Sequence, residues 1–146
     1  MRPNTFSAST VFAAFFVLPV SAASPPPKMM ANVYRLTEAA AVLNVCLESP
    51  PYRNLSNEKA LQLHGLVIRL KDLVQNVAKH YGDEALYLIF ETTKHKLSSD
   101  AEMKTYAKSK YQYCGDQLFL DMEAYVTENE NLINGYFKRQ SQPTKQ

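Results

Sequence analysis

The feature that most constrains the fold is a long apolar stripe that begins after Ser56 and ends before Gly82. Its apolar side chains recur at steps of three or four residues, which places them on one face of a helix. Ser56 can cap the first turn of that helix, and Gly82 suits the left-handed turn that ends it. The stripe is wider than one packing partner needs, so we expect two neighbouring helices on it, and Gly65 is predicted to mark a close crossing. The stripe consists of Leu63, Leu66, Leu70, Leu73, Val77 and Tyr81, and is widened by Val67, Val74 and Ala78.

The segments on both sides of this helix also have helical patterns. A first helix is predicted at residues 28–48, because Pro50 restricts the chain after it. A third is predicted from Asp83 to about Lys96, since a strand there would have no β-rich partner elsewhere. The capping box at residues 99–102 opens a last helical region, which Gly115 can kink or restart. The predicted inward positions are Met30, Val33, Tyr34, Thr37, Ala41, Asn44 and Val45, then Leu86, Ile89 and Phe90, then Met103, Tyr106, Tyr113, Leu118, Met122, Tyr125 and Val126, with Leu132, Ile133, Tyr136 and Phe137 in further turns.

The first 23 residues have the pattern of a cleaved secretory signal. Arg2 supplies a positive charge, residues 10–20 form an apolar run, and Ala23 is a small residue of the kind that signal peptidase prefers. The run is shorter than the roughly 20 residues of a membrane-spanning helix, and an uncleaved anchor is the alternative. The predicted organisation is a signal peptide at 1–23, a proline-rich spacer at 24–27, a helical bundle at 28–138 and a disordered tail at 139–146. The protein is therefore predicted to be periplasmic or secreted.

The chain has two cysteines, Cys46 and Cys114, so only one intramolecular disulfide is possible. Export makes such a bond possible. It would tie the end of the first helix to the last helical region and, through chain entropy, stabilise the fold by about 4 kcal/mol. The predicted fold class is therefore all-α, a bundle of four or five helices with one disulfide.

The formal net charge is only +2 at pH 7. Such a balance gives no overall attraction to nucleic acid or to an anionic membrane. Lysines and tyrosines do alternate in one stretch, which could bind an anionic partner. We favour the alternative, in which tyrosine rings are buried at the edge of the bundle while lysines keep its surface soluble. The stretch consists of Lys104, Tyr106, Lys108, Lys110, Tyr111 and Tyr113.

No pattern in the chain indicates catalysis or a cofactor. The histidines His64, His80 and His95 form no metal motif, although His80 and Glu84, like Glu91 and His95, are spaced four apart. Neither the Gly-x-Ser-x-Gly motif of a serine hydrolase nor the His-Glu-x-x-His motif of a zinc protease occurs. We therefore expect no enzymatic activity, no metal and no cofactor.

The residues that follow each cysteine carry a family resemblance. Cys46 is followed by Tyr52, Asn54, Leu55 and Asn57, and Cys114 by Leu118, Leu120, Ala124, Tyr125 and Val126. Both windows resemble the pilotins of type II secretion, in the PulS and OutS group, which are exported all-helical proteins with a disulfide joining the first helix to the last. The resemblance implies a groove between helices that takes up the C-terminal helix of an outer-membrane secretin subunit. Lipidated pilotins have a cysteine after the signal cut, where this chain has Ala23 and Ser24, so no lipid anchor is implied.

The sequence thus predicts a non-enzymatic bundle that binds another protein by the helix-in-groove mode, and the resemblance implies an outer-membrane secretin as that partner. Three alternatives stay open. The first is an inhibitor or immunity protein of a cell-wall hydrolase, because immunity proteins of type VI secreted amidases have similarly placed cysteines. The second is a small-molecule or lipid carrier, and the third is a purely structural exported domain. The residues predicted to line the partner-binding groove are Leu63, Leu66, Leu70, Leu118, Met122 and Tyr125.

Overall fold

The structure is a computed structural model, and it describes residues 24–48, 56–110 and 115–143. Every regular element in these ranges is a helix, which confirms the all-α prediction. The five helices are α1 (Pro27–Glu48), α2 (Asn57–Tyr81), α3 (Glu84–Ser99), α4 (Ala101–Lys110) and α5 (Asp116–Gln140). The predicted signal segment and Cys114 lie outside the described residues. The structure therefore tests neither the signal peptide nor the Cys46–Cys114 disulfide.

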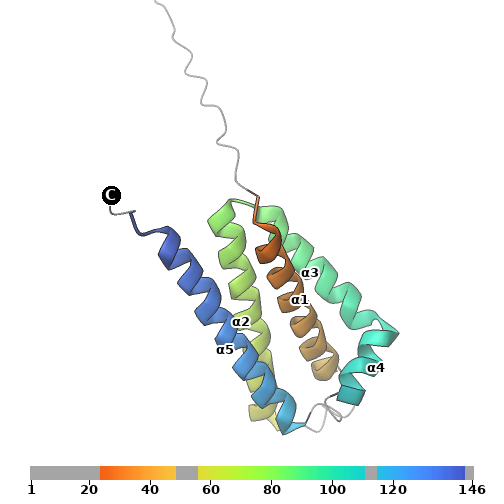
Figure 1. The fold of residues 1–146 in the computed structure, drawn as a ribbon. Coiled ribbons are helices and arrows are strands. Elements are labelled where there is room, and N and C mark those ends of the chain that lie inside the picture. The colour runs from red at the N-terminus through yellow and green to blue at the C-terminus, as the bar shows by residue number, and fades with distance from the viewer. Residues whose placement is uncertain (1–23, 49–55, 111–114, 144–146) are drawn as a thin grey trace, which may run out of the picture.

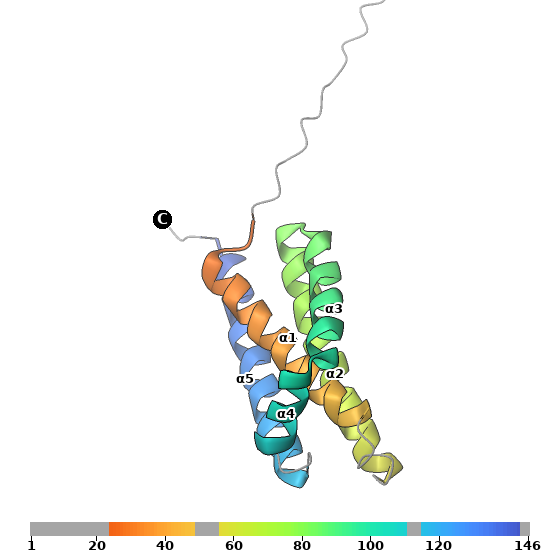
Figure 2. The ribbon, with the colours of Figure 1, turned by 90° about the vertical axis from the view of Figure 1, so that its right-hand side faces the viewer.

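The bundle is built around α1, which packs against α2, α3 and α4. Figure 1 shows α5 and α1 on either side of α2, with the short α4 beside the C-terminal half of α1. Seen from the side in Figure 2, α1 tilts across the pair formed by α2 and α3. Since α5 packs mainly on α2, it forms an outer wall of the bundle.

Helix α1 is buried on several sides, and its predicted apolar face is partly wrong. Val33 and Thr37 are buried as predicted, but Met30 is exposed and Tyr34 is 53% exposed. The fully buried positions include Leu36 and Leu43, because three helices cover α1 from different directions. The helix begins at Pro27, one residue earlier than predicted, since proline fits the first helical turn, where no backbone N–H partner is needed.

Helix α2 agrees with the sequence prediction in both its face and its ends. All eight Leu, Val and Ala members of the stripe from Leu63 to Ala78 are buried. The Ser56 hydroxyl accepts a hydrogen bond from the Lys59 backbone N–H at 3.3 Å. Gly82 ends the helix at φ 62°, the left-handed conformation that glycine adopts without a steric cost. The predicted close crossing at Gly65 is wrong, because an added Cβ there would meet nothing within 4 Å.

The later helices correct several boundaries and three predicted inward positions, because Ile89, Tyr106 and Leu132 are exposed. Leu86 and Phe90 of α3 are buried, whereas Ile89 lies on the solvent side. Ser99 ends α3 instead of capping α4, and the cap is provided by Asp100, whose Oδ1 accepts a hydrogen bond from the Glu102 N–H at 2.8 Å. Helix α5 starts at Asp116 and continues to Gln140, two residues into the predicted tail. None of the helices in the described ranges has an apolar run long enough to cross a membrane.

Candidate functional site

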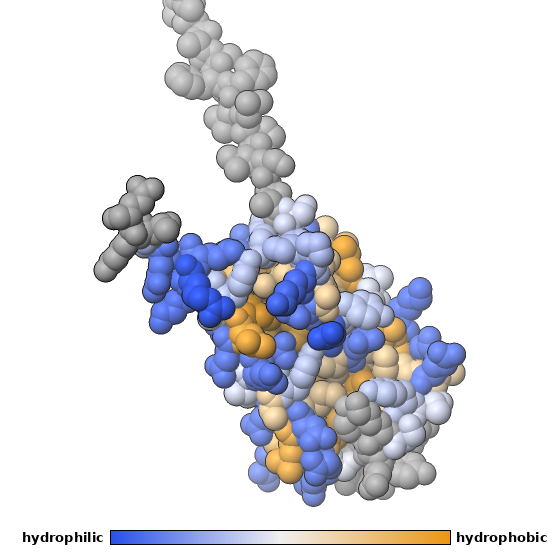
Figure 3. Space-filling model, in the orientation of Figure 1, coloured by the Kyte–Doolittle hydropathy of each residue, from blue (hydrophilic) through white to orange (hydrophobic). Residues whose placement is uncertain are grey.

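A groove of about 750 Å³ lies between α1, α4 and α5, and we call it the α1–α4–α5 groove. Figure 3 looks onto the face with α1 and α5, where apolar side chains alternate with strongly hydrophilic ones. The lining residues span about two turns of α1 and somewhat more than one turn of α5, and α4 contributes two further residues. The lining residues are Arg35, Glu38, Ala39 and Val42 of α1, Met103 and Tyr106 of α4, and Asp121, Met122 and Tyr125 of α5.

Apolar side chains form the deeper part of the α1–α4–α5 groove. Ala39, Val42 and Met122 are buried, and Met103 is half-buried beside them. Tyr125 is also half-buried, and desolvation raises the pKa of its phenol. The nearby Arg35 charge lowers this pKa and the Glu38 charge raises it, and the pKa rises overall. The groove therefore presents a partly dehydrated apolar floor that ends at a charged rim.

The rim of the groove has one cation and two carboxylates. Arg35 and Glu38 project from α1, and Asp121 projects from α5 on the opposite wall. Among residues 24–48, 56–110 and 115–143, no ion pair includes Arg35, Glu38 or Asp121. Asp121 accepts a hydrogen bond from the uncharged amide of Gln117 at 2.7 Å. The rim charges are thus available to a partner.

The structure separates the six residues that the sequence predicted for a partner-binding groove. Met122 and Tyr125 line the α1–α4–α5 groove. Leu63, Leu66, Leu70 and Leu118 are buried in the hydrophobic core. The sequence analysis missed the α1 wall. The run of alanines at 39–41 was the only signal for it, because small side chains leave space between helices.

The α5 wall is held in place by polar contacts with α2. Arg69 binds the Glu130 carboxylate through two hydrogen bonds, from Nε at 2.8 Å and from a terminal guanidinium nitrogen at 2.7 Å, and it also donates to Thr127. The hydrogen bond from Arg69 lowers the pKa of Glu130, and the same bond raises the pKa of Arg69. Lys59 pairs with Asp116 at the start of α5. These contacts position α5 without closing the side that faces α1.

Aromatic side chains join the other ends of α2 and α5. The His80 ring stacks on Phe137 with a centroid separation of 4.0 Å, and its Nε2 lies 3.1 Å from Gln140 Oε1. The Tyr81 hydroxyl donates to the Tyr136 hydroxyl at 3.5 Å. Burial and this contact raise the pKa of Tyr81 to about 12. These contacts show that the His80 side chain packs between α2 and α5.

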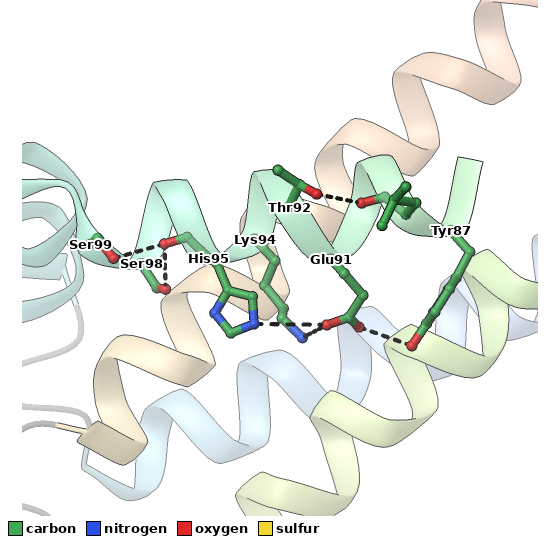
Figure 4. Close-up of polar contacts among 8 residues, drawn as sticks. Tyr87, Glu91, Thr92, Lys94, His95, Ser98 and Ser99 are labelled. Atoms are coloured by element: carbon green, nitrogen blue, oxygen red, sulfur yellow. Dashed lines mark hydrogen bonds and ion pairs between the residues drawn. The ribbon is translucent and has the colours of Figure 1, made fainter. Parts of the chain in front are cut away.

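The second histidine–carboxylate spacing, at Glu91 and His95, belongs to a network on α3 (Figure 4). Glu91 accepts hydrogen bonds from the Lys94 ammonium at 2.8 Å and from the Tyr87 hydroxyl at 3.2 Å, while His95 Nε2 lies 4.0 Å away. Burial raises the pKa of Glu91, but the Lys94 and Tyr87 hydrogen bonds and the Lys94 charge outweigh it and lower the pKa overall. Within the described parts of the chain, no three histidine, cysteine, aspartate or glutamate side chains are grouped to hold a metal ion.

Two other predicted features fall partly outside the described residues. Cys46 is fully buried at the end of α1, and its predicted disulfide partner Cys114 lies in the segment that is not described. In the lysine–tyrosine stretch, Lys104 and Tyr106 are exposed, and Tyr106 lines the α1–α4–α5 groove. The side chains of the other four residues of that stretch are outside the description.

Comparison with protein-family models, with curated proteins and with solved structures found no match for this chain.

Proposed function

We propose that this chain is an exported, non-enzymatic protein-binding bundle whose α1–α4–α5 groove takes up the apolar face of a helix from a partner protein. The single observation that carries the proposal is the groove itself, with its apolar floor between two antiparallel walls. Amphipathic helices bind such grooves through apolar anchors at helical spacing. In its finer form the partner is an outer-membrane secretin subunit, as the pilotin resemblance implies, and a Cys46–Cys114 disulfide staples the bundle.

Two properties of the lining support a helix as the occupant. The lining residues extend over about two turns of α1 and somewhat more than one turn of α5, so an elongated ligand can lie along them. Met103 and Met122 contribute flexible, polarizable side chains, which adapt to differently shaped apolar partners. A carrier of small molecules is the second candidate, because a volume of about 750 Å³ also lies within the usual range of small-ligand pockets.

Site-specific photocrosslinking tests the proposal in the cell that makes the protein. Benzoylphenylalanine is placed at Arg35 or Tyr106, which line the groove, and at Leu88 as a control that is exposed on α3. We expect a discrete protein adduct from the two groove positions and none from position 88. Mass spectrometry of the adduct then separates the finer alternatives, because a secretin would support the pilotin-like function and a wall hydrolase the inhibitor function.

The same experiment can refute the proposal. Equal adducts from positions 35, 106 and 88 would mean that the groove has no preferred protein partner. If no adduct forms and native mass spectrometry finds a lipid or small molecule bound to the full chain, the carrier function replaces protein binding.

A further inference from the structure

We propose that the occupant of the α1–α4–α5 groove is a cationic amphipathic helix, in which lysines or arginines flank the apolar face on both sides. This inference rests on the proposed function, because it names the chemistry of the helix that the groove would take up. It commits to a partner protein of that character, and the charges of the rim carry the argument.

Carboxylates stand on both walls of the groove. Glu38 lines it from α1 and Asp121 from α5, so a helix lying between the walls meets an acidic side chain on each flank. Arg35 offsets one of these charges from its position one turn before Glu38. The charged lining is therefore acidic overall.

These carboxylates keep their capacity to bind a cation. In the described ranges no salt bridge includes Glu38 or Asp121, whereas Glu130 on the other side of α5 is already paired with Arg69. A lysine or arginine on the partner can lay its aliphatic stem along the apolar floor and place its charged end at the rim. An acidic helix would instead bring like charges together on both flanks, which opposes binding.

The test uses three synthetic helical peptides of roughly 18 residues, about five turns. They share one leucine stripe and differ only in the flanking positions, which are lysine, glutamine or glutamate. Binding to the full chain is measured by fluorescence anisotropy at low salt. We expect the lysine peptide to bind about tenfold more tightly than the glutamate peptide, since two partly exposed charge pairs change from attraction to repulsion. The difference should shrink in roughly 0.5 M salt, which screens exposed charges.

Charge reversal on the protein provides the matched comparison. The double variant Glu38→Lys, Asp121→Lys should prefer the glutamate peptide, while the control Asp72→Lys, on the exposed face of α2, should keep the preference for lysine. Circular dichroism checks that each variant keeps its helical content. The salt dependence of the unaltered protein stands as a second measurement if the double variant does not fold.

Equal binding of the three peptides, tighter binding of the glutamate peptide, or binding of none of them would overturn the inference. These outcomes are distinguishable from failure of the proposed function. If groove-specific crosslinks to a protein still form in the cell, helix uptake stands and only the cationic character of the partner is wrong. If the crosslinks are absent, the proposed function fails whichever peptide binds.

Discussion

The replacement of Glu91 by glutamine should destabilise the fold far more than its position near the surface suggests. Glu91 is the carboxylate partner of Lys94, whose side chain is only 8% exposed and whose ammonium lies 2.8 Å from Glu91 Oε2. The Lys94 ammonium also lies 5.4 Å from the centre of the Phe90 ring (Figure 4 shows the polar contacts). Glutamine keeps the size of the side chain but leaves a buried ammonium without an opposite charge.

The expected magnitude follows from burial. Removing one partner of a fully buried ion pair costs about 3–5 kcal/mol, and the 25% exposure of Glu91 lets water compensate in part, so we expect a loss of about 2 kcal/mol. Lys94→Met removes the buried charge and keeps most of the stem, so it should change the free energy of unfolding by less than about 1 kcal/mol. The double variant should therefore be more stable than Glu91→Gln alone.

The pH dependence has a definite sign. The folded-state pKa of Glu91 is lowered, so the carboxylate stabilises the fold above its ordinary pKa of 4.5, and this stabilisation is lost as the pH falls through the lowered pKa. Once Glu91 is protonated, the unaltered protein resembles the glutamine variant at this position. The stability difference between the two proteins should thus be largest near neutral pH and should disappear in acid.

Urea unfolding followed by far-UV circular dichroism measures these differences, with Glu84→Gln as the control. Glu84 lies exposed in the first turn of α3 and forms no ion pair among the described residues. The reasoning is refuted if Glu91→Gln costs no more than Glu84→Gln. It is also refuted if Lys94→Met is the more damaging change, because the ammonium would then contribute stability that the buried pair does not explain.

Three further predictions concern the ends and contacts of the helices. Gly82→Ala should lower the free energy of unfolding by about 1 kcal/mol, because φ is 62° there. Gly65→Ala should raise it by up to about 1 kcal/mol, since the added Cβ meets nothing within 4 Å and alanine favours a helix interior. Paired urea unfolding curves check both signs. Arg69→Ala should lower the free energy of unfolding by about 1 kcal/mol after allowance for partial exposure. The loss should be smaller in high salt, which screens the pair, and in acid, where Glu130 becomes protonated once the pH falls below the pKa that Arg69 lowers. Unfolding measured across salt and pH tests this, and a loss independent of both would contradict it. If the proposed export and disulfide hold, the two cysteines of the denatured protein, purified from the cell envelope, should resist thiol labelling until a reductant is added. Labelling without reductant would exclude the disulfide.

Helix α2 was predictable because each of its signals is local. The stripe repeats on one face over the whole length of the helix, Ser56 needs only the next turn to act as a cap, and Gly82 needs only its own backbone freedom. None of these depends on which helices pack against α2. Gly65 shows the limit of this reasoning, since a close approach depends on a second helix that the local sequence does not specify.

Side-chain direction was harder to predict where a helix is covered from several sides or where apolar residues are adjacent. In α1 the pattern that included Met30 and Tyr34 competes with the one that includes Leu36 and Leu43, and only packing against three neighbours selects the second. Leu132 and Ile133 are adjacent, so they lie about 100° apart around α5, and the face that packs on α2 buries only one of them. Ile133 is buried and Leu132 is exposed.

The position of the groove was not predictable from the apolar stripe, because a wide stripe indicates many contacts without distinguishing a filled interface from an open one. The α2 stripe is filled by the core, and the open space is lined by Ala39 and Val42 of α1 and by Met122 of α5. Small side chains on one wall therefore matter more to the groove than large ones on the opposite helix. Nothing in the spacing of apolar residues conveys that information.

The attachment of α5 explains how the groove can exist without an occupant. Contacts from Lys59 to Asp116, from Arg69 to Glu130 and from His80 to Phe137 join α2 to α5 at nearly constant sequence offset, so the two helices run parallel and are joined at both ends and in the middle. Because this anchoring lies on the α2 side, the wall facing α1 needs no occupant to hold its place. Changes at Arg69 should then act on binding only through stability, whereas changes at the rim should alter binding with stability unchanged.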